Sequence, residues 1–325
     1  MKLNFKHILF VLFSVAFLNV SFAQKARLKY ANKMYDAQSY YFASEGYEDV
    51  IDRKTDSMTV AHRIAESYDK IGNTAKAAEW YRYLNKKGQL SASEKERLSL
   101  VERQLGNYDA SDALQANNGS ALTPTTPRSE LLANNPNYEI TREQKVNTAS
   151  SEMGVSPFED QQMLISSSKR RIMVAKHLQG WTGDYHYDIY RSKVTDEGEL
   201  GKLKLVKSKA KTRFHDGPAI YHEPTKTLYF TRNNFQDGKR SVGSDEVTHL
   251  KIFSAKWNGK KFEDEQSLSI NGEDFSTAHP AISKDGKTLY FSSDRPGGQG
   301  GMDLYKVELD QKEIVWGRQS IWEQK

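Results

Sequence analysis

The sequence predicts a multidomain chain in which all-α helical repeats are followed by an all-β array of small repeated sheets. Two observations carry this prediction: residues 25–117 repeat with a 34-residue step, and a strand–turn–strand pattern recurs three times after residue 149. The 325 residues are 37% hydrophobic and 11% aromatic, which is enough to build packed cores. General disorder is therefore excluded.

Composition also excludes several kinds of site. The sequence contains no cysteine, so it offers no disulfide framework, thiolate zinc site, iron–sulfur cluster or cysteine nucleophile. It also lacks the acylated cysteine of a bacterial lipoprotein. The formal charge of +5 is spread along the chain and is not clustered, so we expect no nucleic-acid partner.

Residues 1–23 have the pattern of a signal peptide. Lys2 and Lys6 form a positive segment, an apolar core runs from Ile8 to Leu18, and Ala23 ends a small-x-small exit. The apolar run is short for a membrane span, which favours cleavage after Ala23 over a membrane anchor. We therefore expect an exported chain in the periplasm or at the periplasmic face of the outer membrane, with membrane association only through partners.

Residues 24–117 have the pattern of three consecutive helix pairs. Helical periodicity runs through each half of a 34-residue unit, and turn residues such as Gly72-Asn73 separate the halves. Small residues would let the two helices of a pair approach closely, while large residues fill the space beside them. The positions that carry the repeat are Ala31, Ala43, Tyr47, Ile64, Ala65, Tyr68, Gly72, Ala77 and Tyr81.

This pattern resembles the tetratricopeptide repeat, and the second unit matches best. The position that holds tryptophan in that repeat is Arg27, Ala61 or Lys95 here, and the proline near the end of each unit is missing. In the third unit Glu102 and Gln115 replace aromatic residues, which suits a polar capping end. An unrelated helical bundle is the alternative.

The resemblance implies a concave surface that binds segments of partner proteins. We therefore expect envelope proteins to bind through the helical repeats. Aromatic residues at these steps belong more often to the core than to a binding face, and we expect this for most of Tyr35, Tyr40, Tyr41, Trp80, Tyr81 and Tyr83.

Residues 118–148 separate the helical part from a strand-rich part. Pro, Asn, Ser and Thr dominate there and the apolar periodicity lapses, so we expect a flexible linker with at most one short helix. Residues 149–325 then alternate short apolar runs with turn residues. This pattern is typical of strands joined by tight turns.

The clearest strand motif lies within residues 279–305. A short apolar strand meets an Asp285-Gly286 turn and continues into Leu289-Tyr290-Phe291, which predicts a hairpin because glycine tolerates the positive φ of such a turn. The same order recurs around Leu228 and, more weakly, around Leu164. The positions that carry this repeat are Pro218, Tyr229, Phe230, Pro280, Asp285, Gly286, Tyr290, Phe291, Asp294, Asp303 and Tyr305.

Four-stranded sheets repeated around an axis form a β-propeller. Only three motifs are visible, whereas closed propellers have roughly 4–8 blades. We therefore expect residues 149–325 to form an incomplete propeller of about three blades. Truncation is favoured over completion by a second copy or closure with unusually few blades.

The run HPAISKDGKTLYFSSDRPGGQGGMDLY is similar to the WD-like repeat of the periplasmic TolB propeller. A signal peptide, tetratricopeptide repeats and such blades together resemble the front half of multidomain envelope proteins of the OmpA family, which occur in gliding, type IX-secreting bacteria. The peptidoglycan-binding domain of that family has no counterpart in these residues. The resemblance therefore implies a place in the envelope and transfers no wall-binding residue.

We expect no catalytic, cofactor-binding or metal-ligating set. The sequence has no G-x-S-x-G elbow, no H-E-x-x-H and no Walker A loop. His215-Asp216 and residues 185–188 could act as metal ligands or acid–base pairs, but a turn or inter-strand role is favoured. Asp294 and Asp303 could bind a cation; we favour a turn role for Asp303, and we expect Arg295 to pair with Asp294 at the surface.

These features favour an exported, non-enzymatic scaffold of the cell envelope. Its helical repeats would hold one protein partner and its propeller face another, in type IX secretion or gliding motility as the resemblance implies. The alternative is a propeller-based periplasmic enzyme that acts on glycans or peptides. It requires paired carboxylates or histidines, such as His215 and His279, to converge on the propeller's channel.

Overall fold

The chain folds into two compact units in the computed structural model. The first unit comprises Met1–Glu139 and Gln179–Gly183, and the second comprises Ile140–Leu178 and Asp184–Lys325. The described residues are 24–51, 57–116, 141–169, 178–208, 214–236, 239–309 and 320–321. The expected signal peptide and most of the expected linker lie outside them. No described helix is long and apolar enough to cross a membrane.

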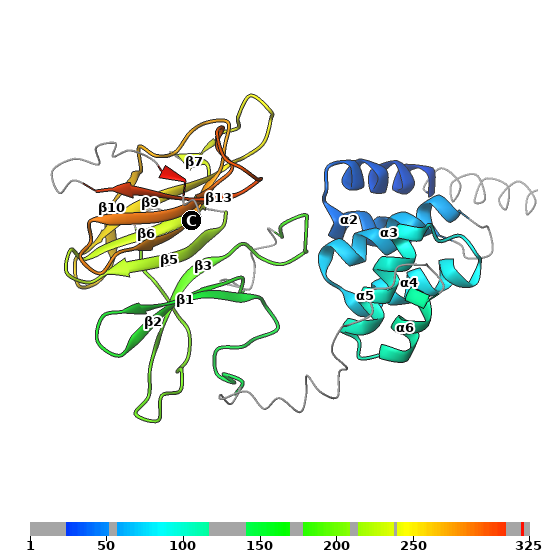
Figure 1. Cartoon of the computed structure of the whole chain (residues 1–325), viewed down its shortest axis with the longest axis horizontal. Helices are drawn as coiled ribbons and strands as arrows, with labels where there is room; N and C mark the ends of the chain where they lie inside the picture. Colours follow the sequence, from blue (N-terminus) through cyan, green and yellow to red (C-terminus); the bar gives the residue numbers. More distant parts are fainter. Residues whose placement is uncertain are drawn as a thin grey trace, which may run out of the picture. The chain divides into compact units, whose positions relative to one another are not determined.

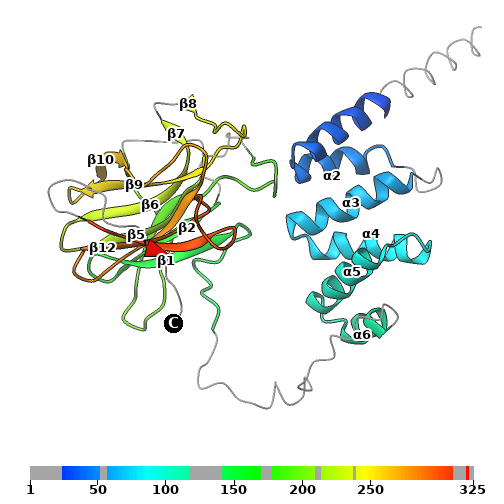
Figure 2. The same ribbon diagram turned by 45° about the horizontal axis from the view of Figure 1, so that its top comes forward.

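The first unit is a row of helices. From α2 onward each helix packs against the next along the chain, and Figures 1 and 2 show them stacked side by side. The helices are residues 24–36, α2 (Tyr40–Glu48), α3 (Met58–Ile71), α4 (Thr74–Lys86), α5 (Ala92–Gln104) and α6 (Tyr108–Ala116).

Buried small residues let these helices approach closely. Ala31, Ala43, Ala65 and Ala77 have no exposed surface, and a Cβ built on Gly46 would lie 3.0 Å from the Cβ of Ala31. The 34-residue step is thus the spacing of side chains that pack between helices. The large repeat positions and two of the other aromatic residues are also buried: Tyr47, Ile64, Tyr68, Tyr81, Tyr40 and Trp80.

Two residues explain the turn between α3 and α4. Gly72 ends α3 in the left-handed conformation at φ 82°, which glycine adopts without strain. The side chain of Asn73 then accepts a hydrogen bond at 3.2 Å from the backbone N–H of Lys76 and caps the start of α4. The Gly72-Asn73 pair is therefore a helix-end signal followed by a helix-start signal.

The expectation of a polar capping end needs a correction at Glu102. This carboxylate is 3% exposed, in the interior of the third helix pair. It accepts hydrogen bonds from Arg82 at 2.5 and 2.6 Å and from the side-chain amide of Asn107 at 2.8 Å. These bonds hold the pKa of Glu102 below its usual value, Arg82 contributing most, so the carboxylate stays charged. An aromatic position of the repeat here carries a buried carboxylate that is paired with a half-exposed arginine.

A non-helical segment, Gln179–Gly183, completes the first unit although it lies between two strands in the sequence. The carbonyl of Gly180 accepts a hydrogen bond at 3.0 Å from the backbone N–H of Tyr41, at the start of α2. The indole of Trp181 donates one at 2.9 Å to the carbonyl of Lys70, at the end of α3. Both backbone groups belong to helix ends, which lack intrahelical partners. The segment thus supplies hydrogen-bond partners to backbone groups at helix ends that have no partner within their own helix.

The second unit consists of three four-stranded antiparallel sheets, which we call blades, and a small two-stranded sheet. Blade 1 contains β1 (Glu152–Phe158), β2 (Gln162–Ser167), β3 (Asp188–Lys193) and β4 (Lys204–Leu205). Blade 2 contains β5 (Asp216–His222), β6 (Thr227–Asn233), β9 (Leu250–Trp257) and β10 (Phe262–Ser267). Blade 3 contains β11 (Thr277–Ile282), β12 (Thr288–Ser293), β13 (Asp303–Glu308) and β14 (Ser320–Ile321). The small sheet pairs β7 (Phe235–Gln236) with β8 (Lys239–Arg240).

Each blade follows the chain from one edge strand to the other, which is the strand order of a propeller blade. The predicted fold class, helical repeats followed by about three propeller-like blades, is confirmed.

The β11–β12 hairpin forms as the sequence predicts. Asp285 accepts a hydrogen bond at 3.1 Å from the backbone N–H of Lys287. Gly286 follows at φ 71°, and a Cβ there would lie 2.4 Å from the ring of His222 in blade 2. Glycine is therefore required for two reasons, the left-handed turn and the close approach of a neighbouring blade.

Blades 2 and 3 each contain an arginine whose guanidinium lies over a pair of aromatic rings. In blade 2, Arg232 lies 4.8 Å from the ring centre of Phe230 and 5.1 Å from that of Phe253. In blade 3, Arg295 lies 5.0 Å from the ring centres of both Phe291 and Tyr305. The rings of each pair are on adjacent strands and are nearly parallel. The aromatic positions of the motif thus form a surface on which a cation rests.

This arrangement corrects the expectation of a surface pair between Asp294 and Arg295. Arg295 is 7% exposed, and its guanidinium donates a hydrogen bond at 2.9 Å to the carbonyl of Ile270. The carboxylate of Asp294 accepts one at 2.6 Å from the backbone N–H of Ser276. Asp294 and Arg295 are therefore adjacent in the motif but bond to different backbone groups.

Asp303 has a turn role. It accepts hydrogen bonds from the backbone N–H groups of Gln299 at 2.8 Å and Gly300 at 3.1 Å. The carboxylate therefore closes the glycine-rich loop before β13.

Candidate functional site

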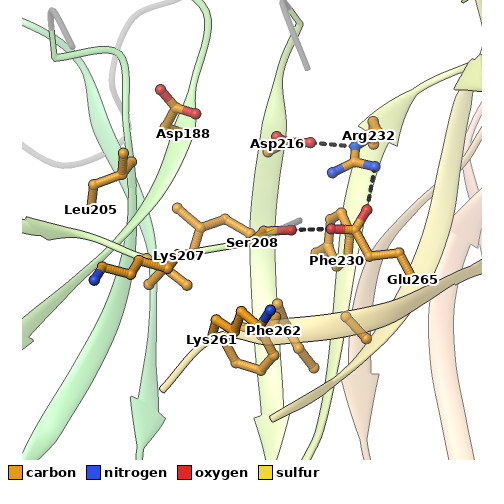
Figure 3. Close-up of a pocket in the computed structure, with 14 residues that line it drawn as sticks. Asp188, Leu205, Lys207, Ser208, Asp216, Phe230, Arg232, Lys261, Phe262 and Glu265 are labelled. Atoms are coloured by element: carbon orange, nitrogen blue, oxygen red, sulfur yellow. Dashed lines mark hydrogen bonds and ion pairs between the residues drawn. The ribbon is translucent and has the colours of Figure 1, made fainter. Parts of the chain in front are cut away.

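A cavity of about 440 Å³ opens in the second unit, and we call it the Arg232 pocket. Residues from β3 and β4 of blade 1 and from all four strands of blade 2 line it, so it lies between these two blades (Figure 3). Much of its lining is apolar, including Ile189, Leu205, Leu228 and Phe262. An apolar cavity with a few polar groups is the usual form of a ligand site.

Arg232 holds the polar wall of this pocket together. Its Nε donates a hydrogen bond at 2.5 Å to Asp216, and its Nη1 donates one at 2.8 Å to Glu265. The side chains of Arg232, Asp216 and Glu265 are only 5%, 11% and 11% exposed. Glu265 also accepts a hydrogen bond from the hydroxyl of Ser208. The wall is therefore a buried network of one cation and two anions.

The guanidinium of Arg232 stays charged at neutral pH. Burial lowers the pKa of Arg232, but the neighbouring carboxylates of Asp216 and Glu265 outweigh that effect and hold it above its usual value. Arginine does not lose its proton in proteins. Its positive charge between the two carboxylates is therefore permanent.

The chain after β4 forms the other side of this wall. Ser208 forms a parallel bridge with Phe262, whose backbone N–H donates a hydrogen bond at 2.9 Å to the carbonyl of Lys207. This pairing brings Ser208 to Glu265 across the edge of blade 2. A segment that follows blade 1 in sequence thus covers the outer strand of blade 2.

Only some of the candidate metal-ligating or acid–base residues that the sequence offers lie at this pocket. Asp216 and Asp188 line it, whereas His215 and His279 do not. The Nδ1 of His215 instead accepts a hydrogen bond at 3.2 Å from the backbone N–H of Tyr187. In the part of the chain that the structure describes, no group of three or more His, Asp or Glu side chains is arranged to hold a metal ion.

Sequence reasoning did not single out Arg232 or Glu265. Arg232 is separated by one residue from the Leu-Tyr-Phe motif. That place, close to a repeated strand motif, is the one feature of the sequence that could have indicated a role for Arg232. Glu265 lies 33 residues further along the chain, in a charged strand without a motif. Only the register of the sheet brings the two side chains together.

His215 makes the stability of the second unit depend on pH. Burial, and to a smaller extent the nearby His186, lower the pKa of His215 from 6.5 to about 4. Between these values the unfolded chain binds a proton that the folded chain does not, so stability is complete above pH 6.5 and falls as the pH drops towards 4. We expect a loss of about 3 kcal/mol over this range from His215 alone.

The measurement is urea unfolding at several pH values with His215→Gln and with the exposed His279→Gln as its control. The wild-type chain and His279→Gln should lose stability together as the pH falls, and His215→Gln should lose less by about 3 kcal/mol. Parallel curves for all three proteins would show that His215 takes up its proton in the folded state.

The first unit carries a separate groove on its first helix pair, with a volume of about 380 Å³. We call it the helix-pair groove; it is lined by Ala26, Arg27, Tyr30, Phe42, Glu45, Gly46 and Asp49. Tyr30 is 49% exposed. Arg27 and Asp49 form an ion pair at 3.3 Å in which both side chains are 60% exposed, so the pair is weak and can exchange partners.

The fold and these two sites define a repeat protein with a helical-repeat unit and a propeller-like unit. No protein-family model matches the chain, and no curated protein matches it. Some solved structures are similar to part of it. A TolB protein from Agrobacterium tumefaciens has 13% identity and a TM-score of 0.31, over 54% of this chain and 49% of that one.

Two enzymes are similar to the same extent. The α-L-arabinofuranosidase from Lactobacillus brevis has 9% identity and a TM-score of 0.34, over 56% of this chain and 57% of the enzyme. Prolyl oligopeptidase B from Galerina marginata has 15% identity and a TM-score of 0.32, over 54% of this chain and 23% of the enzyme. The chain thus spans between 23% and 57% of the lengths of these three proteins. Both enzymes and a TolB protein occur among them, so similarity at this level does not separate an enzyme from a scaffold.

Proposed function

We propose that the chain is an exported, non-enzymatic scaffold of the cell envelope that binds proteins through its helical repeats and its propeller face. The helix-pair groove carries the proposal. It combines an exposed tyrosine, a second aromatic ring at Phe42 and the exchangeable pair of Arg27 and Asp49. Tyrosine, phenylalanine and arginine are the residues that protein interfaces favour.

The Gln179–Gly183 segment supports the same role. It is held by an N–H group at the start of α2 and a carbonyl at the end of α3. Helix ends of the first unit therefore already hold a non-helical piece of chain by backbone hydrogen bonds. A partner segment could use the same kind of contact elsewhere along the row, because every helix has such ends.

A propeller enzyme acting on glycans or peptides is the second candidate, and the Arg232 pocket is the observation that favours it. Hydrolysis of glycosides requires two carboxyl groups that act as acid and as base or nucleophile. Asp216 and Glu265 both accept hydrogen bonds from the same guanidinium, that of Arg232, which holds them in one ion-paired network. Two carboxyl groups that share one cation are poorly placed to act separately as acid and as base, and we favour the scaffold.

The place of this scaffold follows from the resemblance to OmpA-family envelope proteins. We propose that it works in the periplasm or at the periplasmic face of the outer membrane, in type IX secretion or gliding motility. The test is affinity capture from envelope fractions, with a substitution at Tyr30 that leaves the fold intact. Loss of a captured envelope protein on substitution supports the proposal.

A further inference from the structure

A carboxylate in the wall of the Arg232 pocket is not required by the fold. Asp216 and Arg232 are paired neighbours on β5 and β6, and the equivalent pair on β11 and β12 of blade 3 is Thr277 and Ser293. Blade 3 builds the same strands with two small neutral residues, and both accept hydrogen bonds from its own buried arginine, Arg295. Buried ions need strong compensation for their lost hydration, so the carboxylate that blade 2 has in place of a hydroxyl suggests a ligand.

One donor of the network is directed at the cavity. Nε and Nη1 of Arg232 are engaged by Asp216 and Glu265, while Nη2 has no hydrogen-bond partner among the described residues. Figure 3 shows this nitrogen on the side of the guanidinium that faces the pocket. The side chain is 95% buried, so an oxygen atom inside the cavity is the partner that this donor lacks.

The charges around the cavity select a neutral ligand. Among the residues that the structure describes, its lining contains three carboxylates, on Asp188, Asp216 and Glu265, and three cations, on Arg232, Lys207 and Lys261. The formal charges of these described residues cancel, so together they favour neither an anion nor a cation. The carboxylates can accept hydrogen bonds from a ligand, since each has about four lone-pair sites.

We infer that the Arg232 pocket binds a neutral sugar of one or two rings. A sugar hydroxyl accepts a hydrogen bond from Arg232 Nη2 and donates one to a lining carboxylate, so adjacent hydroxyls satisfy both. The C–H face of a sugar ring packs on the apolar lining formed by Leu205 and Phe262. The volume of about 440 Å³ lies within the roughly 300–1,000 Å³ of small-ligand pockets. This site is independent of the helix-pair groove, so either proposal can fail alone.

Saturation-transfer NMR on the mature chain, residues 24–325, tests the inference. The probes are glucose, galactose, arabinose, N-acetylglucosamine and cellobiose, each titrated to high millimolar concentration. At least one should bind, and Asp188→Asn should weaken it about ten- to hundredfold because a hydrogen bond to a charged group is lost. The control is Asp196→Asn, the same change at an exposed position outside the pocket, which should leave binding unchanged.

A second variant covers the case in which Asp188→Asn fails to fold. Leu205→Trp enlarges a partly buried residue of the pocket lining and should block the same probe. Failure of every probe to bind the folded wild-type chain would overturn the inference. Equal binding by wild type, Asp188→Asn and Leu205→Trp would also overturn it, as would binding of an N-acetylated dipeptide amide but of no sugar.

Discussion

Replacing Arg232 with methionine should lower the free energy of unfolding of the second unit by about 3–5 kcal/mol. Methionine keeps much of the packing over Phe230 and Phe253 but removes the charge between Asp216 and Glu265. Two buried carboxylates then lose the cation that lies between them. Urea unfolding of residues 24–325 followed by fluorescence measures the loss.

A matched combination shows whether that loss comes from uncompensated charge. Adding Asp216→Thr and Glu265→Gln to Arg232→Met removes all three charges and copies at position 216 the threonine of blade 3. We expect the triple variant to be more stable than Arg232→Met alone, because no unpaired ion remains in the interior. Losses that simply add from one substitution to the next would contradict a coupled network.

Replacing Phe291 with alanine should cost about 3–5 kcal/mol, the range for a buried phenylalanine. Phe291 is 1% exposed, packs against Tyr305 and lies under the guanidinium of Arg295. Its neighbour Tyr290 is 39% exposed because successive side chains of β12 point to opposite faces. Tyr290→Ala is therefore the control, and we expect it to cost less than about 1 kcal/mol.

Thermal unfolding of Phe291→Ala and Tyr290→Ala measures the two losses of stability. A large loss for Phe291→Ala with a small one for Tyr290→Ala would support the aromatic pair as the repeated core of the blades. Similar losses would mean that Tyr290 packs against something other than solvent, and that the strand faces are assigned wrongly.

The fold was predictable from the sequence because local rules set its spacing. The 34-residue step repeats the small residues that sit between helices, such as Ala31 and Ala65. Likewise, Asp285-Gly286 marks a hairpin whatever its surroundings, because the positive φ of the turn is by itself enough to favour glycine. In a repeat protein the same local pattern occurs in each unit, and agreement among the units strengthens the prediction.

The pocket was beyond prediction because its parts meet only through sheet register. Arg232 and Glu265 belong to β6 and β10, which are separated by β9 in the sheet. Ser208 reaches Glu265 from the chain after another blade. No spacing rule relates these positions, and Glu265 lies in a strand that resembles an ordinary exposed edge in sequence.

Arg295 and Glu102 show a second limit. A charged residue in a sequence suggests a surface, yet both side chains are buried. Arg295 packs on aromatic rings and donates a hydrogen bond to a backbone carbonyl. Glu102 accepts hydrogen bonds from Arg82 and Asn107. Such partners compensate the lost hydration, and they can be identified only once the strands and helices are placed.

Binding of a protein partner through the helix-pair groove is tested most directly by quantitative capture from envelope fractions of the source cells. Three baits are compared: unchanged residues 24–325, Tyr30→Ser, and Tyr290→Ser as an exposed tyrosine of the other unit. We predict that the unchanged bait and Tyr290→Ser recover the same envelope protein, and that Tyr30→Ser recovers at least about tenfold less, the effect of removing an interface tyrosine. Equal recovery by all three baits, or none by the unchanged bait, would contradict a scaffold that works through this groove.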